Sequence, residues 1–173
     1  RENDRFDASI KGMETILTEN HIPYDFIPNN QATEDRLSKY SVVILPNVKC
    51  LSDKEIGLLK SYVGKGGNLL ATYETSLFDV HGSARKDFGL AELFGCHFTG
   101  EKINTMKDCY QFISDPSHPV VMPDSAETEL FINSGYTLLC STAPGAKIIC
   151  SYVPVVHNQP PEKAWTNQWS SIY

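Results

Sequence analysis

The sequence lacks long apolar runs and an excess of basic residues. No apolar run approaches the roughly 20 residues that a membrane-spanning helix requires, and no signal peptide is visible. The 15 basic residues are outnumbered by 21 acidic ones, for a net charge of −6. Because phosphate binding requires clustered Lys and Arg, this balance argues against a nucleic-acid-binding surface. We therefore expect neither a membrane nor a nucleic acid as a partner.

The sequence also lacks paired cysteine motifs. Its five cysteines are widely spaced and odd in number: Cys50, Cys96, Cys109, Cys140 and Cys150. No CxxC pair indicates zinc, and the spacing does not resemble a disulfide framework. The five histidines show no metal-ligand spacing either. The sequence therefore predicts free thiols, no metal and no cofactor. It leaves the compartment open, although free thiols are more typical of the cytoplasm.

A strand–helix–strand unit organises the chain between residues 41 and 76. The first apolar run is Val42–Leu45, and the second is Leu69–Tyr73. The helix between them begins after Ser52, which forms a capping box with Glu55, and ends in a glycine-rich stretch. Apolar runs without alternation indicate strands that are buried on both faces, as in a parallel sheet. The unit is therefore predicted to be a right-handed βαβ crossover.

The segments before this unit extend the same pattern. Residues 6–20 have helical apolar spacing, Tyr24–Ile27 alternates like a strand, and Thr33–Tyr40 is a short helix. This order predicts a flavodoxin-like, doubly wound α/β sheet, mainly parallel, with helices on both faces. A strand before the first helix is expected to be missing. Its absence would leave strand edges near Tyr24 and Val42 open to a partner strand.

The last third of the chain has a different pattern. Two apolar segments, Thr137–Cys140 and Lys147–Val153, are separated by a Pro-Gly turn and predict a C-terminal antiparallel hairpin. The chain is therefore divided into an α/β domain over residues 1–153 and an extended tail over residues 154–173. Aromatic residues of this tail are predicted to form an interface: Trp165, Trp169 and Tyr173.

Ligands of open α/β sheets bind at the carboxyl ends of the strands. The residues predicted to line such a pocket here are Pro46, Asn47, Tyr73, Glu74 and Thr75. Glu74 is a candidate acid or base, and Cys50, ahead of a helix, is a candidate nucleophile. A structural role is favoured for both residues. A glutamate at such a position commonly binds loop amides, and no base for Cys50 can be named.

The run LPNVKCLSDKEIGLLKSYVGKGGNLLATYETSLFD, followed by DFGLAELFG, is more specific than these patterns. It resembles the middle domain of bacterial beta-galactosidases of the family-42 type, which is called the trimerisation domain. The resemblance is strongest over residues 41–95. That domain is similar to class I glutamine amidotransferases that have lost their catalysis, and it also occurs beside barrel domains in related glycoside hydrolases.

The resemblance implies an accessory and oligomerisation domain without catalytic activity. Active amidotransferases carry a Gly-x-Cys-x-Gly elbow where this chain has Thr72–Ser76, with neither the cysteine nor the glycines. Hydrolysis would then reside in a catalytic barrel of the same polypeptide, and the full-length protein would be a homo-oligomer, a trimer in the related enzymes. Two alternatives remain: a carbohydrate-binding module whose tail aromatics stack on sugars, and a hydrolase of the amidotransferase-like superfamily that uses Glu74 or Cys50.

The first prediction concerns catalysis. We expect the 173-residue chain neither to release ammonia from glutamine nor to cleave nitrophenyl galactosides, because it lacks the elbow cysteine and a barrel. Ammonia release and nitrophenol absorbance measure the two activities. Turnover that disappears in Cys50→Ala or Glu74→Gln would contradict this prediction.

Overall fold

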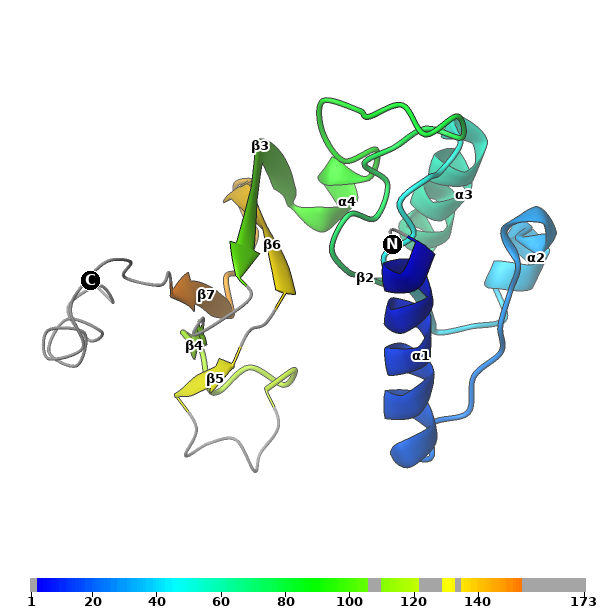
Figure 1. Cartoon of the computed structure of the whole chain (residues 1–173). Helices are drawn as coiled ribbons and strands as arrows, with labels where there is room; N and C mark the ends of the chain where they lie inside the picture. The colour runs from blue at the N-terminus through cyan, green and yellow to red at the C-terminus, as the bar shows by residue number, and fades with distance from the viewer. Residues whose placement is uncertain (1–2, 106–109, 122–128, 133–134, 154–173) are drawn as a thin grey trace, which may run out of the picture. The chain divides into compact units, whose positions relative to one another are not determined.

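The structure is a computed structural model that describes residues 3–105, 110–121, 129–132 and 135–153 (Figure 1). The chain divides into two compact units. The first unit comprises residues 1–101 and 138–144, and the second comprises residues 102–137 and 145–173.

The first unit is built on a parallel pair of strands. Strands β1 (Val42–Leu45) and β2 (Asn68–Ala71) pair in register from Val42 opposite Asn68 to Leu45 opposite Ala71. Helix α3 (Asp53–Gly64) connects them. The predicted strand–helix–strand unit is therefore confirmed.

Helix α3 begins with the predicted capping box. The hydroxyl of Ser52 accepts from the amide of Glu55 at 3.2 Å, and the Glu55 carboxylate accepts from the amide of Ser52 at 2.7 Å. These two bonds satisfy amides that the first helical turn leaves without partners. The buried face of the helix consists of Ile56, Leu59 and Tyr62. This face forms one core cluster with four buried leucines: Leu37, Leu45, Leu51 and Leu90.

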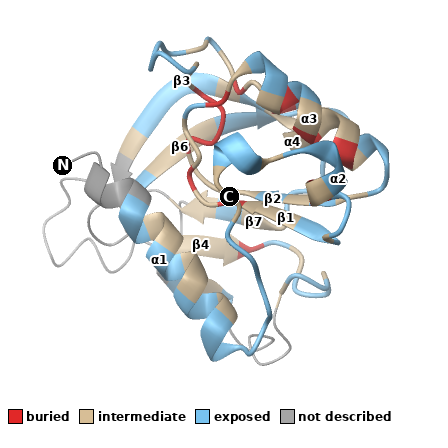
Figure 2. Ribbon diagram, turned by 90° about the vertical axis from the view of Figure 1, so that its right-hand side faces the viewer, coloured by how far each residue is buried: buried red, intermediate tan, exposed pale blue. Residues whose placement is uncertain are grey.

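The segments before β1 match the prediction only in part. Helix α1 (Asn3–Glu19) is followed by a 3-10 helix η1 (Asn29–Gln31) and by α2 (Glu34–Leu37), which Thr33 caps. The strand predicted at Tyr24–Ile27 is wrong, because this segment belongs to none of the sheets in the described part of the chain. Figure 2 shows buried residues on α3, whereas none of residues 7–19 of α1 is buried.

After β2 the chain forms helix α4 (Ala91–Phe94), which ends at Gly95 with φ 64°, and then strand β3 (Cys96–Thr105). Strand β3 pairs with β6 (Gly135–Thr142) in a two-stranded sheet. A second core cluster lies beside these elements, where Leu77, Phe88 and Ala91 are buried.

The second unit contains a three-stranded antiparallel sheet. Its central strand β4 (Tyr110–Ile113) pairs with β5 (Leu130–Ile132) on one side and with β7 (Cys150–Val153) on the other. Strand β4 therefore joins two segments that are distant in the sequence.

The predicted doubly wound, mainly parallel sheet is wrong. Among the described residues, strands form three small sheets, and the pairing in the second unit is antiparallel. The predicted C-terminal hairpin is also wrong, because β6 pairs with β3 and β7 pairs with β4. An apolar run identifies a strand but not its partner, which long-range packing selects. In the described part of the chain, no helix is both long and apolar enough to cross a membrane.

The packing of Tyr62 predicts opposite effects for two glycine substitutions. A Cβ on Gly67 would lie 2.2 Å from Cζ of Tyr62, whose ring is buried and whose hydroxyl donates to the carbonyl of Tyr40. We expect Gly67→Ala to lower the free energy of unfolding by about 1–3 kcal/mol through overpacking.

Gly57, on the exposed side of α3, is the matched control because nothing lies within 4 Å of its Cβ position. We expect Gly57→Ala to raise the free energy of unfolding by about 0.5–1 kcal/mol. Urea titrations of both variants measure these changes, and equal changes of the same sign would contradict the packing described.

Candidate functional site

Polar residues are buried at the carboxyl ends of β1 and β2. They are Asn47, Glu74, Thr75 and Ser76, each no more than 3% exposed. The loops that follow two parallel strands meet at this edge, where the sequence predicts a ligand pocket. Groups so deeply buried require hydrogen-bond partners, and their partners define what the edge can do.

Glu74 forms a buried ion pair. Its carboxylate lies 2.6 Å from the Lys49 ammonium, and the two side chains are 4% and 21% exposed, respectively. The amide of Glu74 donates to Oδ1 of Asn47 at 3.3 Å. A buried carboxylate is costly unless a cation compensates it, so Lys49 is the partner that permits Glu74 to be buried. These contacts join the loop after β1 to the loop after β2.

Two threonine hydroxyls add a second set of links. The Thr75 hydroxyl accepts from the amide of Val48 at 3.2 Å, with the carbonyls of Thr72 and Leu45 at 2.7 and 3.1 Å as acceptors for its proton. The Thr72 hydroxyl accepts from the amide of Asn47 at 3.0 Å. Both hydroxyls are thus engaged with backbone groups.

The backbone at this edge adopts an uncommon conformation. Asn47, Tyr73 and Ser76 have φ values of 55°, 52° and 66° and are not glycines. Such left-handed residues persist where surrounding contacts hold them. Ser76 is held on both sides, since its amide donates to the carbonyl of Val48 and its hydroxyl accepts from the amide of Leu90. The edge is a polar junction whose side chains are buried and hydrogen-bonded.

The structure brings most of the predicted pocket residues together. Asn47, Glu74 and Thr75 lie in the junction, with Pro46 and Tyr73 beside them. Cys50 is exposed and forms an isolated bridge with Phe78. The three tail aromatics, Trp165, Trp169 and Tyr173, lie outside the described residues.

The residues predicted to line the pocket leave out three members of the junction, Lys49, Thr72 and Ser76, although Lys49 and Ser76 lie in the two segments that follow the strands. A usable signal was present, since all three are polar and lie within a few residues of the two strand ends. Which partner each of these side chains contacts depends on the register of β1 and β2. That register cannot be read from the sequence.

The described residues hold no grouped metal ligands, and two of their thiols have raised pKa values. No group of three or more His, Cys, Asp or Glu side chains there is arranged to hold a metal. Partial burial, aided by neighbouring Cys96, raises the pKa of the Cys140 thiol to about 11. Burial likewise raises the pKa of Cys96. Both thiols are therefore protonated at neutral pH, which makes them poor nucleophiles.

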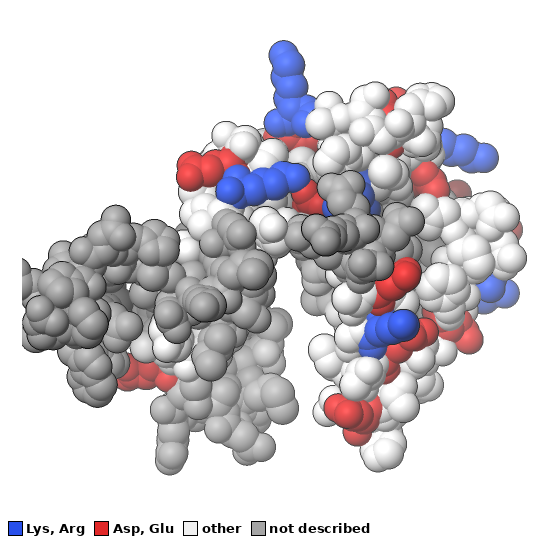
Figure 3. All heavy atoms as spheres, viewed as in Figure 1, with Lys and Arg blue, Asp and Glu red and all other residues white. Residues whose placement is uncertain are grey.

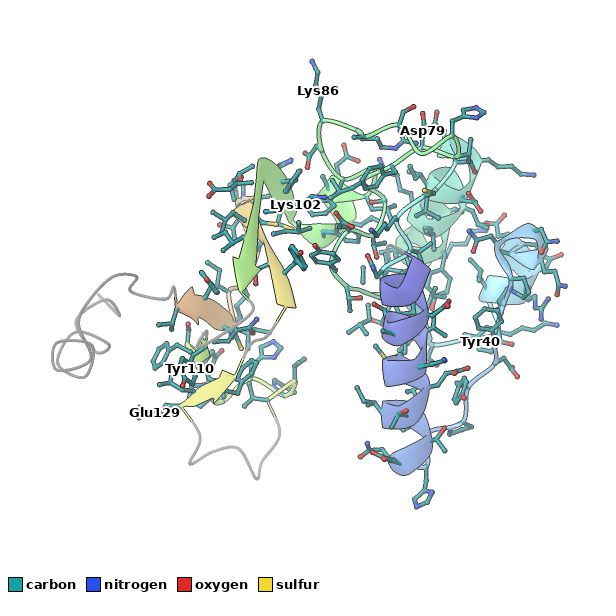
Figure 4. The ribbon with its side chains drawn as sticks, viewed as in Figure 1. Tyr40, Asp79, Lys86, Lys102, Tyr110 and Glu129 are labelled. Carbon is teal, nitrogen blue, oxygen red and sulfur yellow. The ribbon has the colours of Figure 1, made fainter. Side chains whose placement is uncertain are left out.

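The loop Leu77–Arg85, which follows the junction in the chain, is held by hydrogen bonds of its own side chains. Two amides of the loop, those of His81 and Ser83, donate to the Asp79 carboxylate at 2.8 and 2.9 Å. The hydrogen bond from the Ser83 amide is the main reason that the pKa of Asp79 lies below its usual range. Arg85 anchors the loop by donating to the carbonyl of Leu51 at 3.0 Å. Figure 4 shows Asp79 in this loop, and Figure 3 shows both charge signs interspersed on the described face.

Comparison with known proteins gives a family and a fold. The family described as "Beta-galactosidase trimerisation domain" matches residues 14–133. The catalytic mutant of Gan42B, a GH42 beta-galactosidase from G. stearothermophilus, is similar at a TM-score of 0.69 and 21% identity, over 92% of this chain and 21% of that chain. A second Gan42B structure is similar at a TM-score of 0.54 and 22% identity, over 72% of this chain and 17% of that chain.

A beta-galactosidase from Bifidobacterium adolescentis has a TM-score of 0.48 and 18% identity, over 86% of this chain and 67% of that chain. No curated protein matches the sequence significantly. The Gan42B similarities show a shared fold. This chain spans only 17–21% of the length of the Gan42B chains.

The buried ion pair predicts unequal effects for two lysine substitutions. We expect Lys49→Met to lower the free energy of unfolding by about 2–4 kcal/mol, because it removes the ammonium that lies 2.6 Å from the buried Glu74 carboxylate. Lys60 is the matched control, since it pairs with Glu92 at 2.7 Å but both side chains are exposed, at 41% and 79%. Lys60→Met should change the free energy by about 0–1 kcal/mol.

Urea unfolding at neutral pH measures both variants. The double variant Lys49→Met, Glu74→Met should recover part of the loss, because it removes the isolated charge. Losses of the same size for Lys49→Met and Lys60→Met would contradict a structural role for the buried pair.

Proposed function

The chain belongs to the family of beta-galactosidase trimerisation domains, and we propose from this that it helps to assemble a longer glycoside hydrolase. The observation that carries the proposal is the family match over residues 14–133. The match includes β1, α3, β2 and the polar junction at their carboxyl ends. A domain of this family is a non-catalytic accessory domain, so assembly is the activity to assign.

The geometry of the junction supports a scaffold in preference to an active site. The Glu74 carboxylate is neutralised by Lys49 at 2.6 Å, and the hydroxyls of Thr72 and Thr75 bind backbone groups. A general base must be free to accept a proton from a substrate, and these groups are already engaged. The engaged groups hold two loops together, which is what a rigid assembly domain needs.

In this proposal, a catalytic barrel of the same polypeptide hydrolyses the glycoside. The Gan42B chains are beta-galactosidases, and the present chain corresponds to 17–21% of their length. Their activity suggests a galactoside as the substrate class of the whole protein. The kinship with class I glutamine amidotransferases stays a prediction that follows from the resemblance to the trimerisation domain, and the sequence departs from the amidotransferase elbow at Thr72–Ser76.

Two segments are proposed as contacts in the oligomer. One is the tail over residues 154–173, with Trp165, Trp169 and Tyr173 as its anchors. The other is the loop Leu77–Arg85, which Arg85 ties to the body of the first unit. A stable interface needs at least about 1,000 Å² of buried area, which is more than a short tail supplies. We therefore expect both segments to contribute.

Light scattering on the full-length protein tests this proposal. We expect a trimer at micromolar concentration, and a weaker one when Trp165 and Trp169 are both replaced by alanine, because buried aromatics dominate interface energies. Phe131→Ala is the control, since Phe131 is an exposed aromatic (40%) that is not assigned to the interface. A monomeric full-length protein would overturn the assembly role.

A further inference from the structure

Two cysteines lie on neighbouring strands of the first unit. Cys96 begins β3 and Cys140 lies in β6, and these two strands pair with each other (Figure 1). Both residues are free thiols, and both belong to the first unit, which comprises residues 1–101 and 138–144. They are distant in the sequence, so it is the fold that makes them neighbours.

Two hydrogen bonds define how β3 and β6 are aligned. The amide of Ala143 donates to the carbonyl of Gly95 at 2.8 Å. The hydroxyl of Thr99 donates to the carbonyl of Leu139 at 2.9 Å. Residue numbers rise along one strand while those of their partners fall along the other, so the two strands run antiparallel.

This alignment makes Cys96 and Cys140 diagonal neighbours on one face of the strand pair. Gly95 is aligned with Ala143, so Cys96 lies opposite Thr142, and Cys140 is two residues from that position. Residues two apart in a strand share a face, and diagonal neighbours are close enough for their side chains to meet. The two thiols do interact, since each is a hydrogen-bond partner of the other.

The spacing of diagonal neighbours is close to what a disulfide needs. A disulfide joins Cα atoms that are about 4.4–6.8 Å apart, whereas diagonal neighbours lie about 7–8 Å apart. A pair of strands has a wider range of twist than a large sheet, and a small change of twist shortens one diagonal. The sulfur atoms already face each other, so this adjustment is the remaining requirement.

The two thiols differ in how readily they ionise. Partial burial raises the pKa of Cys96, but its hydrogen bond with Cys140 lowers it. Burial raises the pKa of Cys140 to about 11, and the charge and hydrogen bond of Cys96 act in the same direction. The Asp87 carboxylate raises the pKa of both thiols. Cys96 is therefore the first to lose its proton, and Cys140 keeps the proton that stabilises the Cys96 thiolate.

We propose that Cys96 and Cys140 are a reversible dithiol–disulfide pair, which joins β3 to β6 when the protein reacts with a small disulfide such as glutathione disulfide. The chain leaves the first unit after residue 101 and returns to it at residue 138. The bond therefore closes residues 102–137 into a loop at its base. This property goes beyond the proposed assembly role and does not depend on it.

The reaction is two successive thiol–disulfide exchanges. The Cys96 thiolate attacks one sulfur of glutathione disulfide, which forms a mixed disulfide and releases one glutathione thiolate. Cys140 then loses its proton, and its sulfur attacks the Cys96 sulfur of the mixed disulfide, which releases the second glutathione thiolate. The two protein thiols give up two electrons, glutathione disulfide accepts them, and the two protons pass to the released glutathione.

Peptide mapping by mass spectrometry tests the proposal on the 173-residue chain, after incubation with glutathione disulfide and alkylation without reduction. We expect a cross-linked pair of peptides that contains Cys96 and Cys140. A cross-link from either residue to Cys109 would overturn the proposal. Glutathione adducts at Cys96 without a cross-link, or two unmodified thiols at these positions, would also overturn it.

Cysteine variants supply the matched controls. Cys140→Ser should lose the cross-link and leave glutathione attached to Cys96, because the second exchange lacks its nucleophile. Cys50→Ser is the control, since Cys50 is an exposed free thiol outside the pair. It should form the Cys96–Cys140 cross-link to the same extent as the parent sequence. Loss of the cross-link in Cys50→Ser would show that Cys50 takes part, which would contradict the proposed pair.

Urea unfolding of the oxidised and reduced forms measures what the bond does. A disulfide restricts the unfolded chain, so we expect oxidation to raise the urea midpoint by about 1 M. Dithiothreitol should reverse this shift, and glutathione disulfide should not raise the midpoint of Cys140→Ser. A cross-linked protein whose midpoint does not rise would overturn the placement of the bond between two paired strands.

Discussion

The buried ion pair between Lys49 and Glu74 is the contact on which the first unit depends. It neutralises a carboxylate that is almost inaccessible to water, and it joins the loops that follow the two parallel strands. The threonine hydroxyls and Asn47 surround it with hydrogen bonds to backbone groups. Together these contacts hold three left-handed residues without a glycine among them. The parallel pair and α3 are thereby fixed at their polar end.

The carboxyl ends of β1 and β2 differ in character from the outer edge of β1. At the carboxyl edge, where α/β proteins commonly bind ligands, polar side chains are buried and bonded to one another. The other edge of β1 pairs with no strand in the described part of the chain, and exposed apolar residues lie around it, Phe26 and Val42 among them. Exposed apolar residues of this kind suit a domain that associates with other parts of a protein. That property agrees with membership of a trimerisation-domain family.

The candidate site was partly predictable from the sequence. Asn47, Glu74 and Thr75 were found because polar residues that directly follow apolar runs fall at strand ends. The ion pair between Lys49 and Glu74 was not predicted, because it depends on the conformations of the two loops that follow the strands. The strand predicted at Tyr24–Ile27 was wrong for a related reason. Alternating residues have strand propensity, but a strand also needs a partner, and this segment pairs with none that the structure describes.

The sequence by itself determined the local elements and the family. The capping box of Ser52 and Glu55 and the two apolar runs specify β1, α3 and β2, because they act through neighbours a few residues apart. Outside the β1–β2 pair, the tertiary structure alone decided the strand partners. The β3–β6 and β4–β7 pairs are found instead of the expected hairpin. Backbone hydrogen-bonding groups are the same in every sequence, so they do not select the partner of a strand. Which strands meet is then set by packing between distant residues, which no local pattern records.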